Sequence, residues 1–307
     1  MFESNSTSGS TTPLEAPRTW RDSLVLKLFG VGVLVLVLLI PLAMVRGLVS
    51  ERQARLHEVE AEIARSWGSA QTLAGPVIQV PYSYVAGTTN GVTTVAWDVA
   101  YLLPSELVID GRVDPGTRAR GPFQVVVYRA KLRFRGKFRR GDLNLVSAQE
   151  IDWAAARLVV GVPDLRGVRG DLAVLWGERR IPFRPGATGE LATSGINAQI
   201  PGLGELSAET ETPFAFDLDL AGTGSLRFLP YGQQTAVAIR SSWPSPGFVG
   251  AFLPSDREVG PKGFVARWVT SYFGRGYPQS FVGRDLSNLS AQIQSSSFGV
   301  EFVETAD

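Results

Sequence analysis

The chain has 307 residues, of which 30 are Lys or Arg and 29 are Asp or Glu, so its formal net charge is +1. This balance lacks the basic footprint of a nucleic-acid-binding protein, and we expect no nucleic acid among its partners. The sequence contains no cysteine, which excludes disulfides, thiolate catalysis and Cys-ligated zinc. The length is sufficient for one large or two ordinary domains with buried cores.

The first 22 residues begin MFESNSTSGSTTP and are rich in Ser, Thr and Gly. They have little to bury, and we predict a disordered tail over residues 1–22.

An apolar segment, LFGVGVLVLVLLIPLAMV, follows at residues 28–45 and carries no charge. At about 1.5 Å per residue it reaches about 27 Å, close to the thickness of a bilayer's hydrocarbon core. The run is long for a signal peptide, and no small-x-small cleavage site follows it. We therefore predict a retained transmembrane anchor helix over residues 23–48, with the lipid bilayer as a partner. Basic residues flank both ends equally, so charge does not orient the anchor.

Residues 46–67 carry an apolar stripe at helical spacing, formed by Val49, Leu56, Val59 and Ile63. This pattern predicts a juxtamembrane amphipathic helix over residues 49–68. Its apolar face packs against the body of the protein or a membrane helix, or it forms a short coiled-coil stalk, for which two heptads are few. The sequence's one histidine, His57, is interpreted as a surface residue of this helix.

The remaining chain, residues 72–305, predicts strands almost throughout. Segments such as PVIQVPY, TTVAWDVAYLLP and TAVAIRSSW alternate in polarity or run β-branched, with Gly, Pro and Asp between them. The sequence therefore predicts a mainly β fold, with a large β-sandwich-like domain after the two helical segments. A linker-like stretch at residues 186–204 raises the alternative of two lobes.

Few residues in this domain suggest chemistry. With its one histidine outside the β domain, the sequence excludes a His-centred triad or a His-rich metal site there. Asp217 and Asp219 continue the alternation of a strand and lack the spacing of a calcium loop. We expect no catalytic residue, no metal and no cofactor.

The segment YRAKLRFRGKFRR places a cation at every second position. On a strand these side chains share one face, while the residues between them point to the core. Six adjacent cations repel one another, so we expect counter-charges from a neighbouring strand or from an anionic partner such as lipid headgroups. The candidate anionic-partner face consists of Arg129, Lys131, Arg133, Arg135, Lys137 and Arg139.

Aromatic and proline residues gather in SSWPSPGFVGAFLP and in FVARW shortly after it. The first interpretation is a strand end and a proline-braced crossing that bury their rings. The alternatives are a groove for glycan, peptide or lipid with a wall of stacking rings, and a contact with a membrane bundle or a partner subunit. The candidate binding-surface residues are Trp243, Phe248, Phe252 and Trp268.

Several motifs occur in order along residues 24–303: LAGPVIQVPY, YLLPSELVIDG, VVYRAKLRFRGKF, LAGTGSLRFLPYG and SSWPSPGFVGAFLPSDREV. With the anchor and the short helix before them, they resemble the inner-membrane CreD family, described as a cell-envelope-integrity family. The resemblance implies a cytoplasmic N-terminal tail, one crossing of the inner membrane, a large periplasmic β domain and a role in envelope stress. It supplies no catalytic residues. Members of the family continue after this domain into several membrane helices, and this sequence departs from that pattern because it stops at Asp307, where those helices would begin.

Two function classes follow. The first is a non-enzymatic envelope protein whose periplasmic domain binds or braces other envelope components, including envelope proteins. The second is an enzyme acting on a cell-wall glycan or peptide, which a cleft with two carboxylates about 5–10 Å apart would favour.

Overall fold

The structure is a computed structural model, which describes residues 24–141, 148–186, 191 and 193–302. The predicted tail over residues 1–22 lies outside the described residues, as does the side chain of His57. The chain divides into a unit that ends at Leu56 and a unit that begins at His57, and each is described by itself.

Helix α1 runs from Leu24 to Trp67 without interruption, although Pro41 lies inside it. Within the described residues it is the one helix long and apolar enough to cross a membrane. Its large apolar side chains between Leu28 and Val49 are 44–72% exposed, a surface suited to lipid rather than to water. The sequence predicted two helical segments, 23–48 and 49–68; the structure has one helix in their place, which covers residues 24–67 of this range. The residues that follow Val45 are mostly good helix formers and contain no proline, so nothing ends the helix there.

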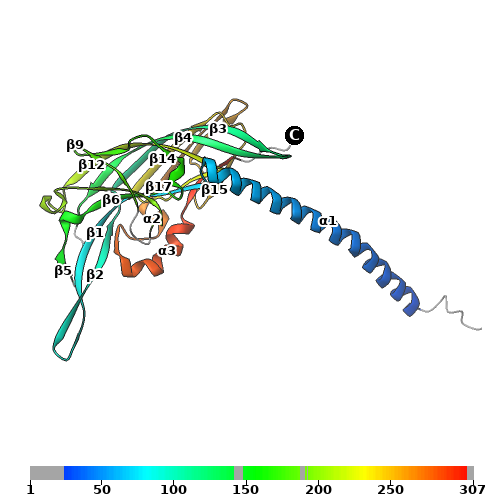
Figure 1. Cartoon of the computed structure of the whole chain (residues 1–307), viewed down its shortest axis with the longest axis horizontal. Coiled ribbons are helices and arrows are strands. Elements are labelled where there is room, and N and C mark those ends of the chain that lie inside the picture. The colour runs from blue at the N-terminus through cyan, green and yellow to red at the C-terminus, as the bar shows by residue number, and fades with distance from the viewer. Residues whose placement is uncertain (1–23, 142–147, 187–190, 192, 303–307) are drawn as a thin grey trace, which may run out of the picture. The chain divides into compact units, whose positions relative to one another are not determined.

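The unit that begins at His57 consists mainly of strands (Figure 1). Its described strands are β1 (Gln71–Thr89), β2 (Val92–Leu102), β3 (Glu106–Arg120), β4 (Phe123–Arg139), β5 (Ala148–Ile151), β6 (Arg157–Gly161), β7 (Val168–Arg169), β8 (Ala173–Trp176), β9 (Arg179–Pro182), β10 (Arg184–Pro185), β11 (Gly195–Gln199), β12 (Glu211–Thr223), β13 (Ser225–Phe228), β14 (Gln234–Ser241), β15 (Pro246–Gly250), β16 (Asp256–Gly260), β17 (Gly263–Ser271), β18 (Ser280–Val282) and β19 (Phe298–Phe302). Its further described α-helices are α2 (Tyr272–Arg275) and α3 (Leu286–Ser295).

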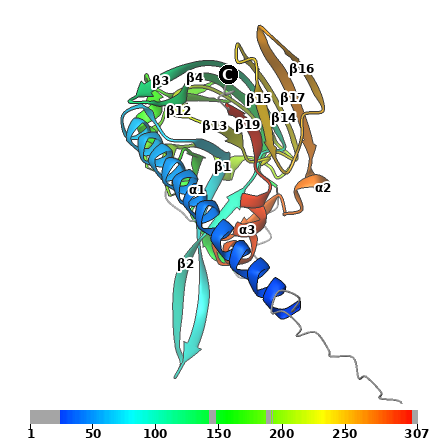
Figure 2. The same ribbon diagram turned by 90° about the vertical axis from the view of Figure 1, so that its right-hand side faces the viewer.

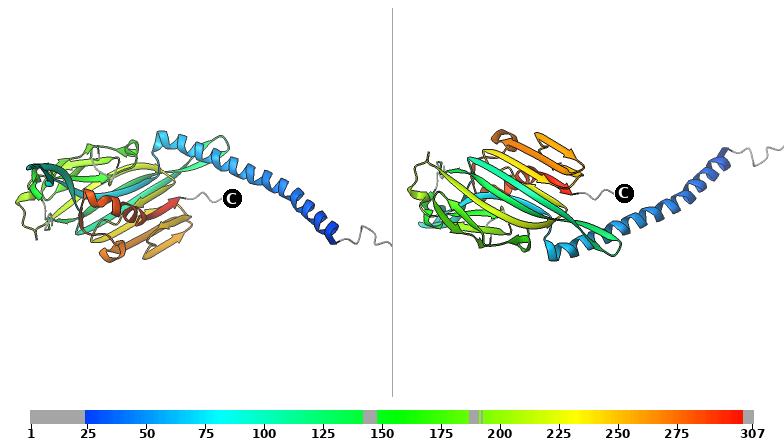
Figure 3. Two further views of the ribbon diagram at one scale, coloured as in Figure 1. Left: turned by 90° about the horizontal axis from the view of Figure 1, so that it is seen from below. Right: turned by 90° about the horizontal axis from the view of Figure 1, so that it is seen from above.

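In the described part of the chain the strands form two sheets. Sheet I has ten strands and follows the order β10-β11-β6-β1-β13-β19-β15, with β2, β5 and β18 beside this path. Sheet II has nine strands in the order β16-β17-β14-β3-β4-β12-β8-β9, with β7 paired to β12. In Figure 3 the long strands of sheet II run side by side. This architecture confirms the predicted mainly β fold.

Aromatic side chains join the two sheets. Tyr128 of β4 lies 5.3 Å from Phe302 of β19, measured between ring centroids. Trp268 of β17 lies 5.8 Å from Phe298 of β19 and 5.8 Å from Phe248 of β15. The core therefore lies between the sheets, where each of these large rings removes much apolar area from water.

The linker-like stretch at residues 186–204 does not separate two lobes. Its residues 195–199 form β11, which pairs with both β10 and β6 inside sheet I. Ile196 and Ala198 are buried there, and Gly195 lies so close to the backbone of Val160 that a Cβ would collide with its carbonyl oxygen. The glycine and small residues that suggested a linker serve close strand packing instead.

Polar contacts fix the end of α1 to the strands that follow. The Asp164 carboxylate accepts hydrogen bonds from the backbone N–H of Ser69 at 3.0 Å and from the guanidinium of Arg166 at 2.8 Å. Arg166 in turn donates to the carbonyl oxygen of Arg65 at 2.9 Å. Asp164 is only 7% exposed, and its hydrogen bond with Arg166 is the main cause that lowers its pKa to about 2.

Candidate functional site

The outer side of sheet II carries most of the charged side chains identified from the sequence. The burial pattern of β4 alternates strictly over residues 129–135, with each basic residue exposed and each residue between them buried. Neighbouring strands β3, β12, β14 and β7 present charged residues to the same side. We call this surface the charged face, and it comprises Glu106, Asp110, Arg112, Asp114, Arg129, Lys131, Arg133, Arg135, Lys137, Arg139, Arg169, Glu211, Asp217, Asp219 and Arg240.

Cations in the middle of β4 have acidic partners on both neighbouring strands. Arg133 lies opposite Asp110 of β3 and opposite Asp217 of β12. Its Nε donates to Asp217 at 2.9 Å, and this hydrogen bond raises the pKa of Arg133. Arg135 forms an ion pair with Asp110 at 2.5 Å. Such exposed pairs contribute only about 0–1 kcal/mol each, so they neutralise charge more than they stabilise the fold.

The C-terminal cations of β4 converge on Glu211 of β12. Arg139 lies 3.2 Å and Lys137 lies 3.6 Å from its carboxylate. Partial burial acts to raise the pKa of Glu211, but hydrogen bonds from Ser105 and Arg139 and the charges of both cations lower it. This end of the strand is therefore held as a compact ion-pair cluster.

Arg129, at the other end of the basic run, is partnered by an aromatic ring. Its guanidinium lies 5.2 Å from the ring centroid of Trp67, the last residue of α1, and Arg118 lies 4.9 Å from the same centroid. The indole N–H of Trp67 donates to the carbonyl oxygen of Tyr128 at 3.2 Å. Arg129 thus holds the helix end on the sheet and is less available to a ligand.

One register row of the charged face is left with an excess of positive charge. Arg240 of β14 lies directly opposite Arg112 of β3, and Arg112 lies directly opposite Lys131 of β4. The row continues through Asp219 of β12 to Arg169 of β7. We call Arg240, Arg112, Lys131 and Arg169 the cationic row. Like charges directly opposite each other on neighbouring strands destabilise a sheet.

Local ion pairs relieve little of this repulsion. Arg112 contacts Asp114 of its own strand at 3.1 Å, and both side chains are more than half exposed. Within the described ranges, Lys131, Arg169 and Arg240 form no ion pair.

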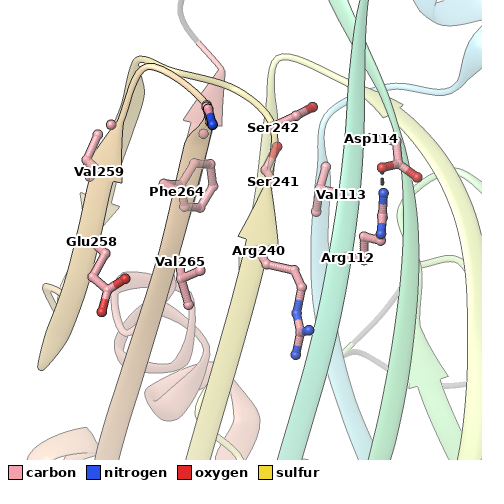
Figure 4. A pocket seen from close by; sticks show the side chains of 13 residues that line it. Arg112, Val113, Asp114, Arg240, Ser241, Ser242, Glu258, Val259, Phe264 and Val265 are labelled. Atoms are coloured by element: carbon pink, nitrogen blue, oxygen red, sulfur yellow. Dashed lines mark hydrogen bonds and ion pairs between the residues drawn. The ribbon is translucent and has the colours of Figure 1, made fainter.

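Two surface depressions meet at the cationic row. One, of about 520 Å³, is lined by residues of β3, β14, β16 and β17 and includes Lys262 (Figure 4). The other, of about 860 Å³, lies over β3, β4 and β12 and includes Lys131 and Arg169. Arg112 and Arg240 line both. Guanidinium groups bind phosphate and carboxylate oxygens in a bidentate manner, so this junction is suited to anionic groups.

The aromatic candidates lie at the seam between the two sheets. Trp268 is 1% exposed, so its assignment to a binding surface is wrong: the alternation of β17 turns Phe264, Ala266 and Trp268 inward together. The other three candidates are half-buried and pack on the core. Trp243 lies 6.4 Å from the ring of Phe302. Their position favours the interpretation of buried rings over a stacking wall.

The rings of the proline-rich segment make edge-to-face contacts with strand residues. Phe248 meets Phe264 at 5.7 Å, and Phe252 meets Phe298 at 5.8 Å. The indole N–H of Trp243 is satisfied locally, because it donates to the carbonyl oxygen of Ser245 at 3.1 Å. These contacts fix the segment as a brace between strands.

Sequence reasoning missed Arg112, Arg169 and Arg240. Arg112 shows the same alternation in IDGRVD that marks the cations of β4, and this signal was readable. Its opposition to Arg240 depends on the parallel pairing of β3 with β14, two strands more than a hundred residues apart. No local pattern reveals such a register.

The described residues contain no group of three His, Cys, Asp or Glu residues that could hold a metal ion.

A long apolar helix followed by a two-sheet β body is typical of a membrane-anchored β protein. The family model described as inner membrane protein CreD matches residues 23–307, and the chain belongs to this family. It is 29% identical to the inner membrane protein CreD of Escherichia coli (strain K12) over 271 residues. This alignment covers 87% of the chain and 58% of that relative. The chain thus spans less than two thirds of the relative's length, and its membership of this family supports an inner-membrane location.

Proposed function

We propose that the chain is a non-enzymatic envelope protein that crosses the inner membrane once, with its β body in the periplasm, and binds anionic envelope components at the cationic row. The observation that carries this proposal is the register of Arg240, Arg112 and Lys131, three cations directly opposite one another on neighbouring strands. A bound anion would remove the repulsion that this row imposes on the sheet.

Phosphate is the anionic group that fits this row best. Two guanidinium groups and one ammonium group can each approach a different oxygen, and two of them line both depressions. Phosphate groups occur on lipid headgroups and on envelope glycans, and the row would recognise the group they share.

An enzyme that acts on a cell-wall glycan or peptide is the alternative. A general acid in such an enzyme needs a carboxyl group whose pKa is raised toward neutrality. The pKa of Asp164 is lowered, mainly by its hydrogen bond with Arg166, and the pKa of Glu211 is also lowered. In the larger depression, Asp110 and Asp217 each accept a hydrogen bond from an arginine. With lowered pKa values, Asp164 and Glu211 are not suited to act as that general acid.

Titration of the full chain with tripolyphosphate tests the binding proposal. The chain would be placed in nanodiscs of zwitterionic phosphatidylcholine, so that the bilayer supplies no competing net charge. We expect saturable binding that weakens as salt is raised. At about 0.1 M salt the attraction between exposed charges is already largely screened beyond about 10 Å. Absence of binding at low salt would contradict the proposal. Cleavage of peptidoglycan fragments that disappears in Asp217→Asn would favour the enzyme.

The membrane side of the body can be tested separately, because the sequence contains no cysteine. In Lys262→Cys the new thiol lies at an exposed position. A membrane-impermeant maleimide should label it in cells whose inner membrane is intact. Labelling that appears only after the inner membrane is permeabilised would place the body in the cytoplasm.

A further inference from the structure

A two-stranded ribbon extends from sheet I and is formed by the second half of β1 and the first half of β2. It projects away from the other strands in both views (Figures 1 and 2). Residues 85–89 of β1 pair with residues 92–95 of β2. The neighbouring strand β5 pairs with β1 only up to Tyr84, and β18 pairs with β2 only from Ala100. In the described structure the ribbon tip therefore has no third strand.

The ribbon closes with a turn suited to its sequence. Asn90 and Gly91 both have positive φ angles, 53° and 77°, as a two-residue hairpin turn of type I′ requires. Asn-Gly is the preferred pair for this turn, so the ribbon is a specified element and its tip is a defined place on the molecule.

Exposed apolar side chains line the ribbon. Val85 and Val95 lie directly opposite each other, and Trp97 lies two residues further along on the same face. Their exposed fractions are 40%, 48% and 58%, and Val92 beside the turn is 68% exposed. Residues 85–97, VAGTTNGVTTVAW, contain no charged residue. Exposed strands usually carry charges that prevent association, so an uncharged apolar ribbon indicates a surface that is covered in the working protein.

We infer that this ribbon dips into the interfacial layer of the bilayer to which the chain is anchored. Helix α1 tethers the body to a membrane. The ribbon therefore meets the bilayer at a high effective concentration. Tryptophan is enriched at the headgroup level, where its ring has an apolar body and its N–H meets polar groups. A tip of Val, Thr, Gly and Asn carries no charge, so it enters this layer without the free-energy cost of dehydrating a charged group.

The backbone limits the depth of insertion. Each edge of a two-stranded ribbon has unpaired N–H and C=O groups, which are not tolerated in the hydrocarbon core. The ribbon therefore reaches the headgroup layer and the uppermost acyl carbons, and does not cross the membrane.

A second copy of the chain fits the ribbon less well. A stable protein interface buries about 800 Å² per partner and uses about 20–30 residues on each side. The ribbon offers four apolar side chains, which is sufficient for shallow membrane contact and too little for a dimer.

The inference is tested with a fluorophore whose emission reports a nonpolar environment, attached to Val92→Cys in the full chain. The chain, one copy per nanodisc, would sit in phosphatidylcholine, and part of the lipid would carry a spin label near the top of its acyl chain. We expect a blue-shifted emission that the spin-labelled lipid quenches by at least half. The matched control is Val269→Cys with the same fluorophore, at an exposed valine of β17 outside both depressions, which should be quenched several-fold less.

A second variant separates lipid contact from protein contact. Adding Trp97→Ser to Val92→Cys should reduce the quenching at least twofold, while adding Val269→Ser, which changes an exposed valine of β17, should leave it unchanged. Emission at position 92 that matches the control position would overturn the inference. A blue shift without quenching by the spin-labelled lipid would also overturn it, because it would show contact with protein rather than lipid.

Discussion

The two faces of sheet II are made by the same strands and serve different ends. On β4, Phe134 and Phe138 turn inward and are at most 1% exposed, whereas Arg135 and Lys137 between them stand in solvent. The inner face fills the space between the sheets, and the outer face carries the charged residues. Alternation with a period of two thus separates the residues that determine stability from the residues available for binding.

Within the outer face, two adjacent rows differ in their charge balance. In one row Asp110, Arg133 and Asp217 alternate in sign, and Arg267 at the edge pairs with Asp256 at 2.9 Å. In the next row, two residues further along the strands, Arg240, Arg112 and Lys131 lie side by side. Charges in the first row are balanced by acidic partners within the fold, whereas the second row keeps an excess of positive charge.

The largest effect is expected from the inner face. Trp268→Ala removes a fully buried ring that contacts Phe248 and Phe298, at a cost of about 3–5 kcal/mol in the free energy of unfolding. Trp243→Ala should cost clearly less, because its ring is half-buried. Thermal melting of the chain in nanodiscs compares them. A Trp268→Ala protein as stable as the wild type would show that the inner face does not hold the sheets together.

A charge buried near the end of α1 should matter more than the exposed charges. The pKa of Asp164 falls from 3.8 to about 2 on folding, mainly through its hydrogen bond with Arg166. A lowered pKa contributes about 2 kcal/mol that is present above pH ~4 and lost as pH falls toward 2. Asp164→Asn should therefore be less stable by about this amount at pH 7, and the difference should shrink in acid. A difference that does not change between pH 7 and pH 2 would contradict this assignment.

Removing a cation from the row of Asp110, Arg133 and Asp217 should have a small effect on stability. Arg133→Ala loses one exposed ion pair, with Asp217, and should leave the free energy of unfolding nearly unchanged, because water and salt screen such a pair. Chemical denaturation measures this change. A loss of several kcal/mol would mean that the outer face, too, holds the fold together.

The smallest effect, and the one of opposite sign, is expected in the cationic row. Arg112→Gln removes a charge that lies opposite two other cations, so it should leave stability unchanged or raise it by up to about 1 kcal/mol at low salt. High salt should abolish the gain because it screens the repulsion. Clear destabilisation by Arg112→Gln would show that the row is already neutralised within the protein.

Local patterns in the sequence were sufficient to predict the apolar segment of α1, the strands and the exposed face of β4. The period-two alternation also places Trp268 with Phe264 and Ala266, and it was the density of aromatic residues that suggested a surface instead. Two features could not be read locally. β11 was taken for a linker because glycine serves both loops and close strand packing, and the cationic row depends on the non-local register of β14 with β3.

The central claim is that the cationic row binds anions because its charge is unmatched, and paired variants of equal net charge test it most directly. Lys131→Gln/Arg240→Gln removes two cations of the row that form no ion pair within the described residues, whereas Arg139→Gln/Arg267→Gln removes two that form ion pairs. We expect the first pair to weaken tripolyphosphate binding by at least tenfold, about 1.4 kcal/mol, and the second by less than about twofold. Equal losses in both variants would mean that only net charge attracts the anion and would contradict the claim.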